Sequence, residues 1–135
     1  MKMEYERPEM TFRDIFEDAL NTNKYKGADE YQKDAARTIM TPDNSDKMLT
    51  HGLLGLCSEV GEVQGIFQKT FQGHEADPEH LIKELGDVLW MIAEICTACG
   101  FSMSDVMKIN IDKLWERYPN GFDSDKSLHR KEGDI

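Results

Sequence analysis

The fold is decided by residues 47–72, KMLTHGLLGLCSEVGEVQGIFQKTFQ, and by residues 79–99, EHLIKELGDVLWMIAEICTAC. Apolar residues recur in both stretches at intervals of three and four, the period of an amphipathic α-helix. Gly73 and Asp77-Pro78 lie between the stretches, and proline is favoured in the first turn of a helix. The sequence therefore predicts two long helices whose short connection makes them antiparallel neighbours.

Shorter helices are predicted on either side of this pair. Helical spacing indicates one over residues 11–21, a second over 29–40 and a third over 105–117. Ser104 would cap the third helix at its N-terminus, and Gly100 would close the second long helix. No stretch alternates as a β-strand does. We therefore expect an all-α protein, a bundle of four or five helices.

The chain is long enough for one domain with flanking segments. We expect the main helical domain over residues 29–122, an N-terminal extension over residues 1–28 and a polar tail over residues 123–135. The tail is a segment that a partner subunit or a ligand could order. One domain is the natural interpretation of 135 residues.

Composition excludes several classes of protein. The 135 residues carry 16 Lys and Arg against 26 Asp and Glu, a formal net charge of −10, which argues against a nucleic-acid-binding protein with its basic surface. Three cysteines do not make a disulfide framework. The N-terminus lacks the apolar core of a signal peptide, and the longest uncharged stretch, residues 48–58, is far shorter than the roughly 20 residues that span a bilayer. We expect a soluble, cytoplasmic protein.

Four carboxylates lie in unusually apolar parts of the two long helices. Glu59 and Glu62 are three residues apart, as are Glu84 and Asp87, so each pair projects from one helix face. Counted from the connection, Glu62 and Asp87 differ in height by only about 3 Å, so the pairs can face each other. Four facing carboxylates cannot all stay ionised without a cation, and oxygen ligands suit Mg²⁺ or Mn²⁺. For either pair alone, a solvated helix face is the alternative interpretation.

Two further patterns have more than one interpretation. Gly52 and Gly55 share a helical seam with the first acid pair, where they could leave room for a ligand or allow close contact between helices. Asn110, Lys113 and Arg117 share one face of the last long helix, where they could bind an anion such as phosphate. Spacing alone favours an ordinary exposed surface for these three residues.

The motifs, taken in order, resemble those of the MazG-like, all-α nucleoside triphosphate pyrophosphohydrolases. The family motif is Glu-Glu-x-x-Glu, a spacer and Glu-x-x-Asp; here it reads Ser58-Glu59-Val60-Gly61-Glu62 and Glu84-Leu85-Gly86-Asp87, with Ser58 in place of the first Glu. A short-chain subgroup with a small residue at that position is more similar still. Its other hallmarks are matched by Tyr31-Gln32, Gly55-Leu56, Lys69-Thr-Phe-Gln-Gly-His74, Lys83-Glu-Leu-Gly-Asp-Val-Leu-Trp90, Asn110 to Lys113-Leu114 and Arg117-Tyr-Pro-Asn-Gly-Phe122. The resemblance covers residues 29–132.

The resemblance implies hydrolysis of a (deoxy)nucleoside triphosphate between the α- and β-phosphates, giving a monophosphate and pyrophosphate. It also implies dependence on Mg²⁺, for which Mn²⁺ could substitute, and a homodimer or homotetramer. Carried over by position, the metal ligands would be Glu59, Glu62, Glu84 and Asp87, and Glu59 or Glu62 would orient or deprotonate the attacking water. Lys69, Lys113 and Arg117 would hold the polyphosphate, and Asn110 would hydrogen-bond sugar or phosphate.

Two alternatives accompany this expectation. Ser58, at the position of a motif carboxylate, is compatible with a non-catalytic helical module that binds nucleotides or regulates while keeping the fold. A related helical pyrophosphohydrolase acts on phosphoribosyl-ATP. The Lys-Thr-Phe-Gln-Gly-His and Arg-Tyr-Pro-Asn-Gly-Phe stretches fit the nucleotide group better.

Overall fold

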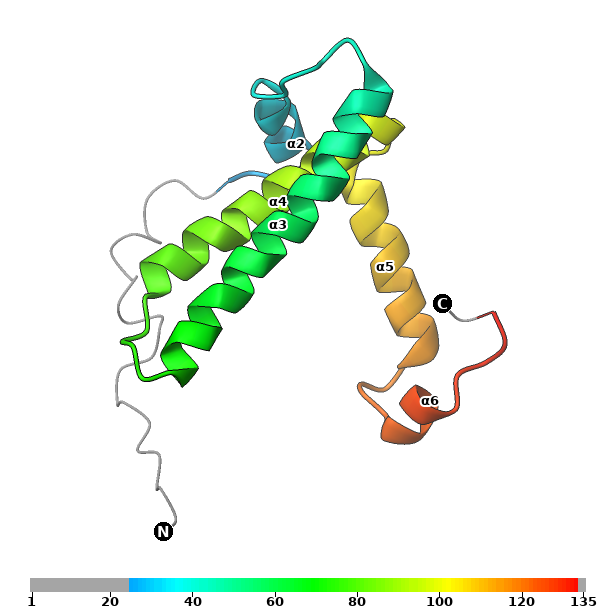
Figure 1. Ribbon diagram of the computed structural model, residues 1–135. Coiled ribbons are helices and arrows are strands. Elements are labelled where there is room, and N and C mark those ends of the chain that lie inside the picture. The colour runs from blue at the N-terminus through cyan, green and yellow to red at the C-terminus, as the bar shows by residue number, and fades with distance from the viewer. Residues whose placement is uncertain (1–24, 134–135) are drawn as a thin grey trace.

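The computed structural model describes residues 25–133, which are predominantly helical (Figure 1). Along the chain follow α2 (Ala28–Ala36), α3 (Ser45–Phe71), α4 (Pro78–Cys99), α5 (Met103–Arg117) and α6 (Ser124–Leu128). Within the described range no strand forms, and one isolated bridge pairs Pro119 with Gly121. The all-α prediction is confirmed. The helix predicted over residues 11–21 lies outside the described residues.

The two long helices, α3 and α4, lie side by side and antiparallel, as predicted, and make the most extensive helix contact in the described chain (Figure 1). The Asn44 side chain caps α3 by accepting the N–H of Lys47 at 2.9 Å. Asp77 caps α4 in the same way, accepting the N–H of His80 at 3.0 Å. Gly100, with φ of 73°, ends α4 in the left-handed conformation that glycine adopts without strain.

Two glycines allow α3 and α4 to approach closely. A Cβ atom at Gly52 would lie 2.8 Å from Cγ1 of Ile95, and one at Gly55 would lie 2.2 Å from Sδ of Met91. Met91 is itself only 2% exposed. These glycines therefore face the neighbouring helix rather than a ligand, which settles the ambiguity in the sequence pattern.

A buried polar pair also joins the long helices. Glu94 of α4 is 2% exposed, and its two carboxylate oxygens lie 3.0 and 2.8 Å from Nδ1 of His51 on α3. A buried carboxylate is costly unless it is hydrogen-bonded, so His51 offsets the burial of Glu94. The pair therefore ties α3 to α4 at a place away from the acidic motifs.

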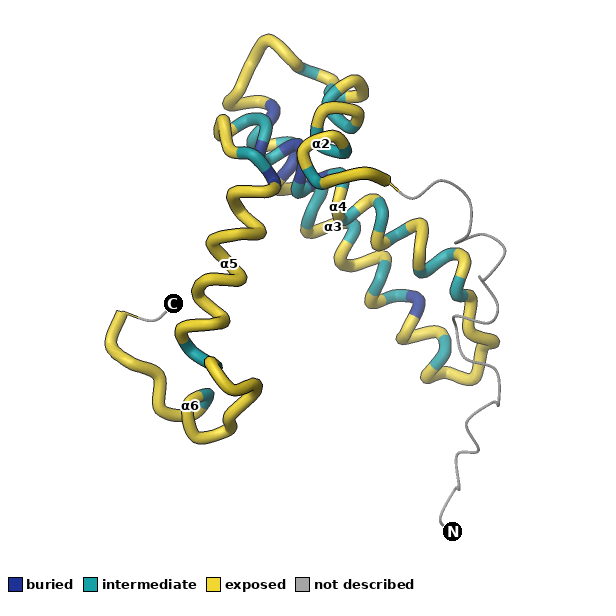
Figure 2. The backbone as a smooth tube through the Cα atoms, turned by 180° about the vertical axis from the view of Figure 1, so that it is seen from behind, coloured by how far each residue is buried: buried dark blue, intermediate teal, exposed yellow. Residues whose placement is uncertain are grey.

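The short helix α2 packs across α4 and the start of α5. The buried residues beneath it are Ala93, Cys96 and Met103, with Ala28, Tyr31, Ala35 and Ile92 packed against them. Gln32 fastens α2 to the turn between α4 and α5, because its amide donates to the carbonyl of Phe101 at 2.9 Å and accepts the N–H of Met103 at 2.7 Å. Figure 2 shows the buried positions gathered in this region.

The predicted cap of α5 was wrong. Ser102 caps this helix, because its backbone is extended and its hydroxyl accepts the N–H of Asp105 at 3.1 Å. Ser104 lies inside the helix, where its N–H and hydroxyl donate to the carboxylate of Asp29 at 2.9 and 2.6 Å. These two bonds lower the pKa of Asp29.

Two other boundaries differ from the prediction. α2 ends at Ala36, short of the expected Met40, and the chain continues in tight turns in which the N–H of Thr38 bonds the carbonyl of Ala35 at 3.1 Å. The polar tail contains α6, whose cap is the Asp123 side chain accepting the N–H of Lys126 at 3.1 Å. A local cap therefore starts a short helix in the tail, the segment for which a partner subunit or a ligand was the expected source of order.

The helix α5 leaves the α3–α4 pair at a bend of 103° instead of packing along it (Figure 1). It is exposed over most of its length, apolar side chains included, so that Ile109 and Trp115 are 69% and 64% exposed (Figure 2). Among the described residues no single helix is long and apolar enough to cross a membrane, and α4 with α5 reaches that length only across their bend. The described part of one chain thus leaves several apolar side chains of α5 uncovered.

Candidate active site

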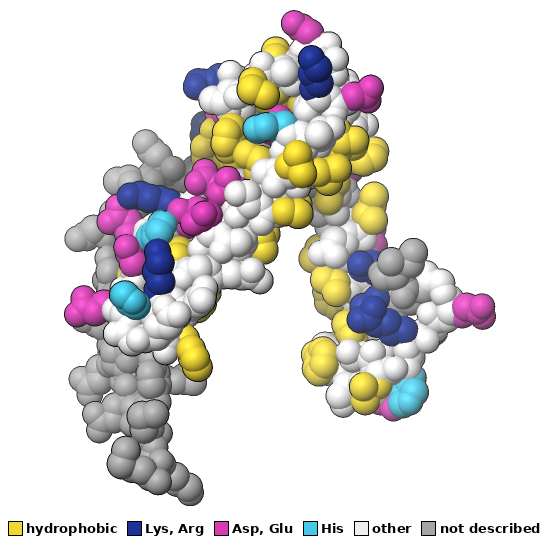
Figure 3. Space-filling view, viewed as in Figure 1, with side chains coloured by type: hydrophobic (Ala, Val, Ile, Leu, Met, Phe, Trp, Pro, Cys, Tyr) yellow, Lys and Arg dark blue, Asp and Glu magenta, His cyan; other side chains and the backbone are white. Residues whose placement is uncertain are grey.

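Three carboxylates from two helices meet on one side of the α3–α4 pair. Glu59 comes from α3, Glu84 and Asp87 come from α4, and each offers an oxygen within 4.8 Å of the other two. Because Glu84 and Asp87 are three residues apart, α4 presents them on one face, and the close contact of the helices brings Glu59 to them. Figure 3 shows acidic side chains gathered over this helix pair. We call these three residues the acid group.

Like charges and partial burial strain the acid group electrostatically. Burial raises the pKa of Glu59, and the charges of Asp87, Glu84 and Glu62 raise it further. A divalent cation among the oxygens would relieve this repulsion. Carboxylate oxygens are the ligands that Mg²⁺ and Mn²⁺ prefer, so the donor set fits a hard divalent cation.

Glu62 lies apart from the acid group. Its side chain is exposed, and none of its oxygens falls within the 4.8 Å group, although its charge contributes to the raised pKa of Glu59. Glu84 and Asp87 have the same three-residue spacing and both join the group, so the spacing alone does not exclude Glu62. The rotation of α3 about its axis turns Glu59 toward α4 and leaves Glu62 exposed. The structure therefore brings together three of the four predicted carboxylates, and a ligand role for Glu62 stays a prediction.

Two residues beside the acid group were not predicted as site residues. Nε2 of His80 lies 2.8 Å from Oε1 of Glu84, one helical turn away on α4. The Tyr31 hydroxyl of α2 donates to the carbonyl of Gly86 at 3.4 Å, and burial together with the charge of Asp87 raises its pKa. The four-residue spacing from Glu84 was the available signal for His80. The sequence indicates Tyr31 only as a motif residue, because its approach to α4 depends on tertiary packing.

A buried donor lies one turn beyond Asp87. The indole Nε1 of Trp90 is buried and has no hydrogen-bond acceptor among the described residues. A buried donor without an acceptor costs about 1–3 kcal/mol, so Trp90 is a local cost to stability beside the acid group.

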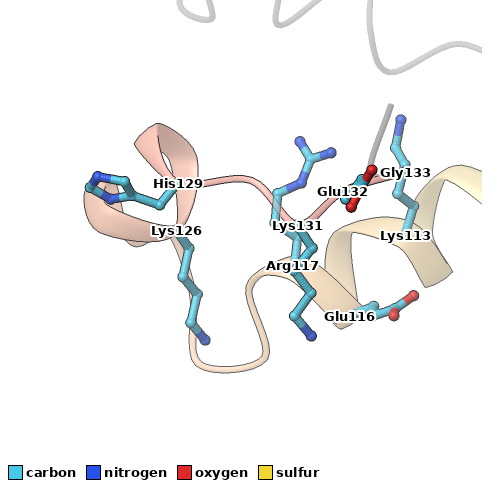
Figure 4. A pocket seen from close by; sticks show the side chains of 8 residues that line it. All are labelled: Lys113, Glu116, Arg117, Lys126, His129, Lys131, Glu132 and Gly133. Atoms are coloured by element: carbon cyan, nitrogen blue, oxygen red, sulfur yellow. The ribbon is translucent and has the colours of Figure 1, made fainter.

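The predicted phosphate-binding residues do not all lie together. Lys113 and Arg117, near the end of α5, line a cavity of about 500 Å³ with residues of the C-terminal segment (Figure 4). Asn110 is exposed on α5 and is not among the lining residues, and Lys69 is exposed in the last turn of α3. Figure 3 shows basic side chains on the α5–α6 part of the molecule, separate from the acid group.

Sequence comparisons identify a related protein and a family. The gene 37 protein of Mycobacterium phage L5 is 29% identical over 102 residues, which cover 69% of this chain and 90% of the phage protein. No solved structure matches the chain significantly. Residues 49–122 match the MazG nucleotide pyrophosphohydrolase domain, and this segment contains the acid group together with Lys113 and Arg117. Because the match spans more than half of the 135 residues, the chain belongs to the MazG nucleotide pyrophosphohydrolase domain family.

Proposed function

We propose that the chain is a Mg²⁺-dependent nucleoside triphosphate pyrophosphohydrolase that cleaves a (d)NTP between the α- and β-phosphates. The observation that carries the proposal is the convergence of Glu59, Glu84 and Asp87 within 4.8 Å in a chain of the MazG family. A protein with a net charge of −10 repels a triphosphate, and a cation at the acid group would reverse the sign of the local field. Mn²⁺ has similar ligand preferences and is the expected substitute.

The residues of the acid group and His80 would have different roles in the reaction. A bound divalent cation would polarise the phosphate oxygens and neutralise charge on the leaving pyrophosphate. Glu84 and Asp87 would hold the ion, and His80 would orient Glu84. Glu59 would also accept a proton from the attacking water, because its raised pKa makes it a better base than an ordinary glutamate. Glu62 is the second candidate for that base.

The polyphosphate would be held by cations from another chain. Lys113 and Arg117 lie on the α5–α6 part of the molecule, apart from the acid group of the same chain (Figure 3). We propose a homodimer or homotetramer in which α5 of one chain reaches the acid group of another. Such an association would bury the exposed apolar side chains of α5, including Ile109 and Trp115.

Pyrophosphate release tests the activity. The full chain is incubated with Mg²⁺ and a panel of dNTPs, NTPs and modified nucleotides, beside the isosteric variant Glu59→Gln. Monophosphate and pyrophosphate in equal amounts, formed about 100-fold more slowly by Glu59→Gln, would support the proposal. Failure of every substrate to exceed that variant would instead support the non-catalytic nucleotide-binding module that Ser58 suggests.

Mixing two inactive variants tests the shared site. Glu59→Gln keeps the cations, and a Lys113→Gln/Arg117→Gln double variant keeps the acids. If each site combines two chains of a dimer, random mixing makes about half of the dimers mixed. Each mixed dimer has one intact site, with the acids of one chain and the cations of the other, and one site with both defects. Mixing therefore restores up to about a quarter of wild-type activity. No recovery on mixing, or light scattering at the 15.5 kDa of one chain, would contradict the association.

A further inference from the structure

We infer that the C-terminal segment, residues 124–133, completes a polyphosphate-binding cavity to which Lys126 and Lys131 contribute cations beside Lys113 and Arg117. The identity of the ligand rests on the proposed function, whereas the cavity and its charge do not. Neither Lys126 nor Lys131 belongs to the motifs that carried the sequence-based prediction. The inference therefore adds two binding residues to the site.

The cavity has the size and construction of a ligand site. Its volume of about 500 Å³ lies within the range of roughly 300–1,000 Å³ that is usual for small-molecule sites. The last turns of α5 supply Lys113, Glu116 and Arg117, and the chain around α6 supplies the facing residues (Figure 4). The facing residues are Lys126, His129, Lys131, Glu132 and Gly133.

A specific turn brings the two walls together. Gly121 adopts φ of 94°, a left-handed conformation that favours glycine, so the chain can reverse after α5. The rings of Tyr118 and Phe122 pack across this turn with centroids 5.5 Å apart, and the Arg117 guanidinium lies 5.8 Å from the Tyr118 ring centroid. The Arg117-Tyr-Pro-Asn-Gly-Phe122 motif thus has a structural effect, which is to return the tail toward the cations of α5.

The charge of the cavity favours an anion. Four basic side chains and two carboxylates, Glu116 and Glu132, line the cavity, in a chain whose net charge is −10. Among the described residues, Lys126 and Lys131 have no ion-pair partner for their ammonium groups. His129 is held by Asp125, with Nδ1 and Oδ1 3.0 Å apart. Arg pairs with phosphate oxygens bidentately and Lys binds them as a point charge, so the set suits a chain of phosphates better than one carboxylate.

Inorganic tripolyphosphate is the probe for the cavity. Its binding to the full chain is measured by calorimetry in EDTA at low salt, with Lys126→Gln/Lys131→Gln as the test variant. Lys33→Gln/Lys47→Gln is the matched control, since it removes the same charge from exposed positions on α2 and α3. We expect the test variant to bind at least about tenfold more weakly and the control to change less than about threefold. Absence of binding by the wild type, or equal weakening in both variants, would overturn the inference.

A second comparison separates the two sources of phosphate, the substrate triphosphate and the pyrophosphate product. If the cavity holds the substrate, the test variant raises the KM for the nucleotide, whereas if it holds the product, only inhibition by pyrophosphate weakens. A test variant that changes neither quantity would overturn the assignment to this reaction. Tripolyphosphate binding by a chain that hydrolyses no nucleotide would contradict the proposed function but support the anion-binding cavity. Failure of the proposed function can therefore be distinguished from failure of this inference.

Discussion

Replacing Gly52 by alanine should destabilise the chain, even though alanine is the better helix former. The new Cβ would lie 2.8 Å from Cγ1 of Ile95, 3.4 Å from its backbone nitrogen and 3.5 Å from the carbonyl oxygen of Met91. The clash is with Cγ1 of Ile95, whereas the two backbone atoms lie at ordinary contact distances. Because Cγ1 is only two bonds from the Ile95 backbone and cannot swing away freely, α3 must shift relative to α4 to admit the new Cβ. Overpacking of this kind costs about 1–3 kcal/mol, and the gain in helix propensity returns about 1 kcal/mol.

Gly65→Ala is the control, because it lies in the same helix and no atom would lie within 4 Å of its Cβ. Both variants gain the same helix propensity, so their difference isolates the steric clash. Gly52→Ala should therefore be less stable than Gly65→Ala by about 1–3 kcal/mol, and its Tm lower by roughly 4 °C for each kcal/mol.

Urea unfolding followed by circular dichroism gives the two free energies. All samples have the same protein concentration, because association would make stability depend on it. Separation of α3 from α4 would also move Glu59 away from Glu84 and Asp87, so Mn²⁺ should bind Gly52→Ala more weakly than Gly65→Ala. Equal stability of the two variants would refute close packing of the helices at Gly52.

Three further predictions concern individual polar groups. His80→Gln should weaken Mn²⁺ binding by about tenfold in a calorimetric titration, because Glu84 loses the partner that orients it; an unchanged affinity would show that His80 has no positioning role. His51→Ala should lower the free energy of unfolding by about 2 kcal/mol, because it leaves the buried Glu94 unpaired, and a loss below about 0.5 kcal/mol would contradict that function for the pair. The third prediction compares the free energy of unfolding of the wild type with that of Glu59→Gln in EDTA. The difference should favour the wild type most below the unfolded-state pKa of 4.5, because the protonated carboxyl avoids the costs of burial and repulsion. It should fall as the pH rises through the raised folded-state pKa of Glu59. Unfolding measured across this pH range would contradict the raised pKa if the slope had the opposite sign.

Local sequence relationships explain why much of the helix pair and acid group could be predicted. Glu84 and Asp87 share a face because of their spacing alone, and the short connection before Pro78 makes α3 and α4 antiparallel. Glu59 then lies at the height along α3 that places it opposite Glu84 and Asp87. The exclusion of Glu62 from the group depends on the rotation of α3 about its axis, which spacing does not specify.

The direction of α5 could not be predicted, because residues distant in sequence determine it. The N–H of Met103 bonds Gln32, 71 residues earlier, and the N–H of Ser104 bonds Asp29, 75 residues earlier. Nothing in the periodicity of residues 105–117 indicates these partners. The cavity around Lys126 likewise requires the reversal at Gly121. Predicting either feature needs the tertiary packing of the chain.

The decisive measurement is the rate at which the full chain, with Mg²⁺, converts its best nucleotide substrate to monophosphate and pyrophosphate. Wild type is compared with Asp87→Asn, which removes one carboxylate of the acid group, and with Asp46→Asn, which removes an exposed carboxylate from the first turn of α3. We expect equimolar products from the wild type and Asp46→Asn, and a rate at least about 100-fold lower for Asp87→Asn with its helical circular dichroism unchanged. Turnover by Asp87→Asn at the wild-type rate, or release of orthophosphate in place of pyrophosphate, would contradict a pyrophosphohydrolase built on the acid group.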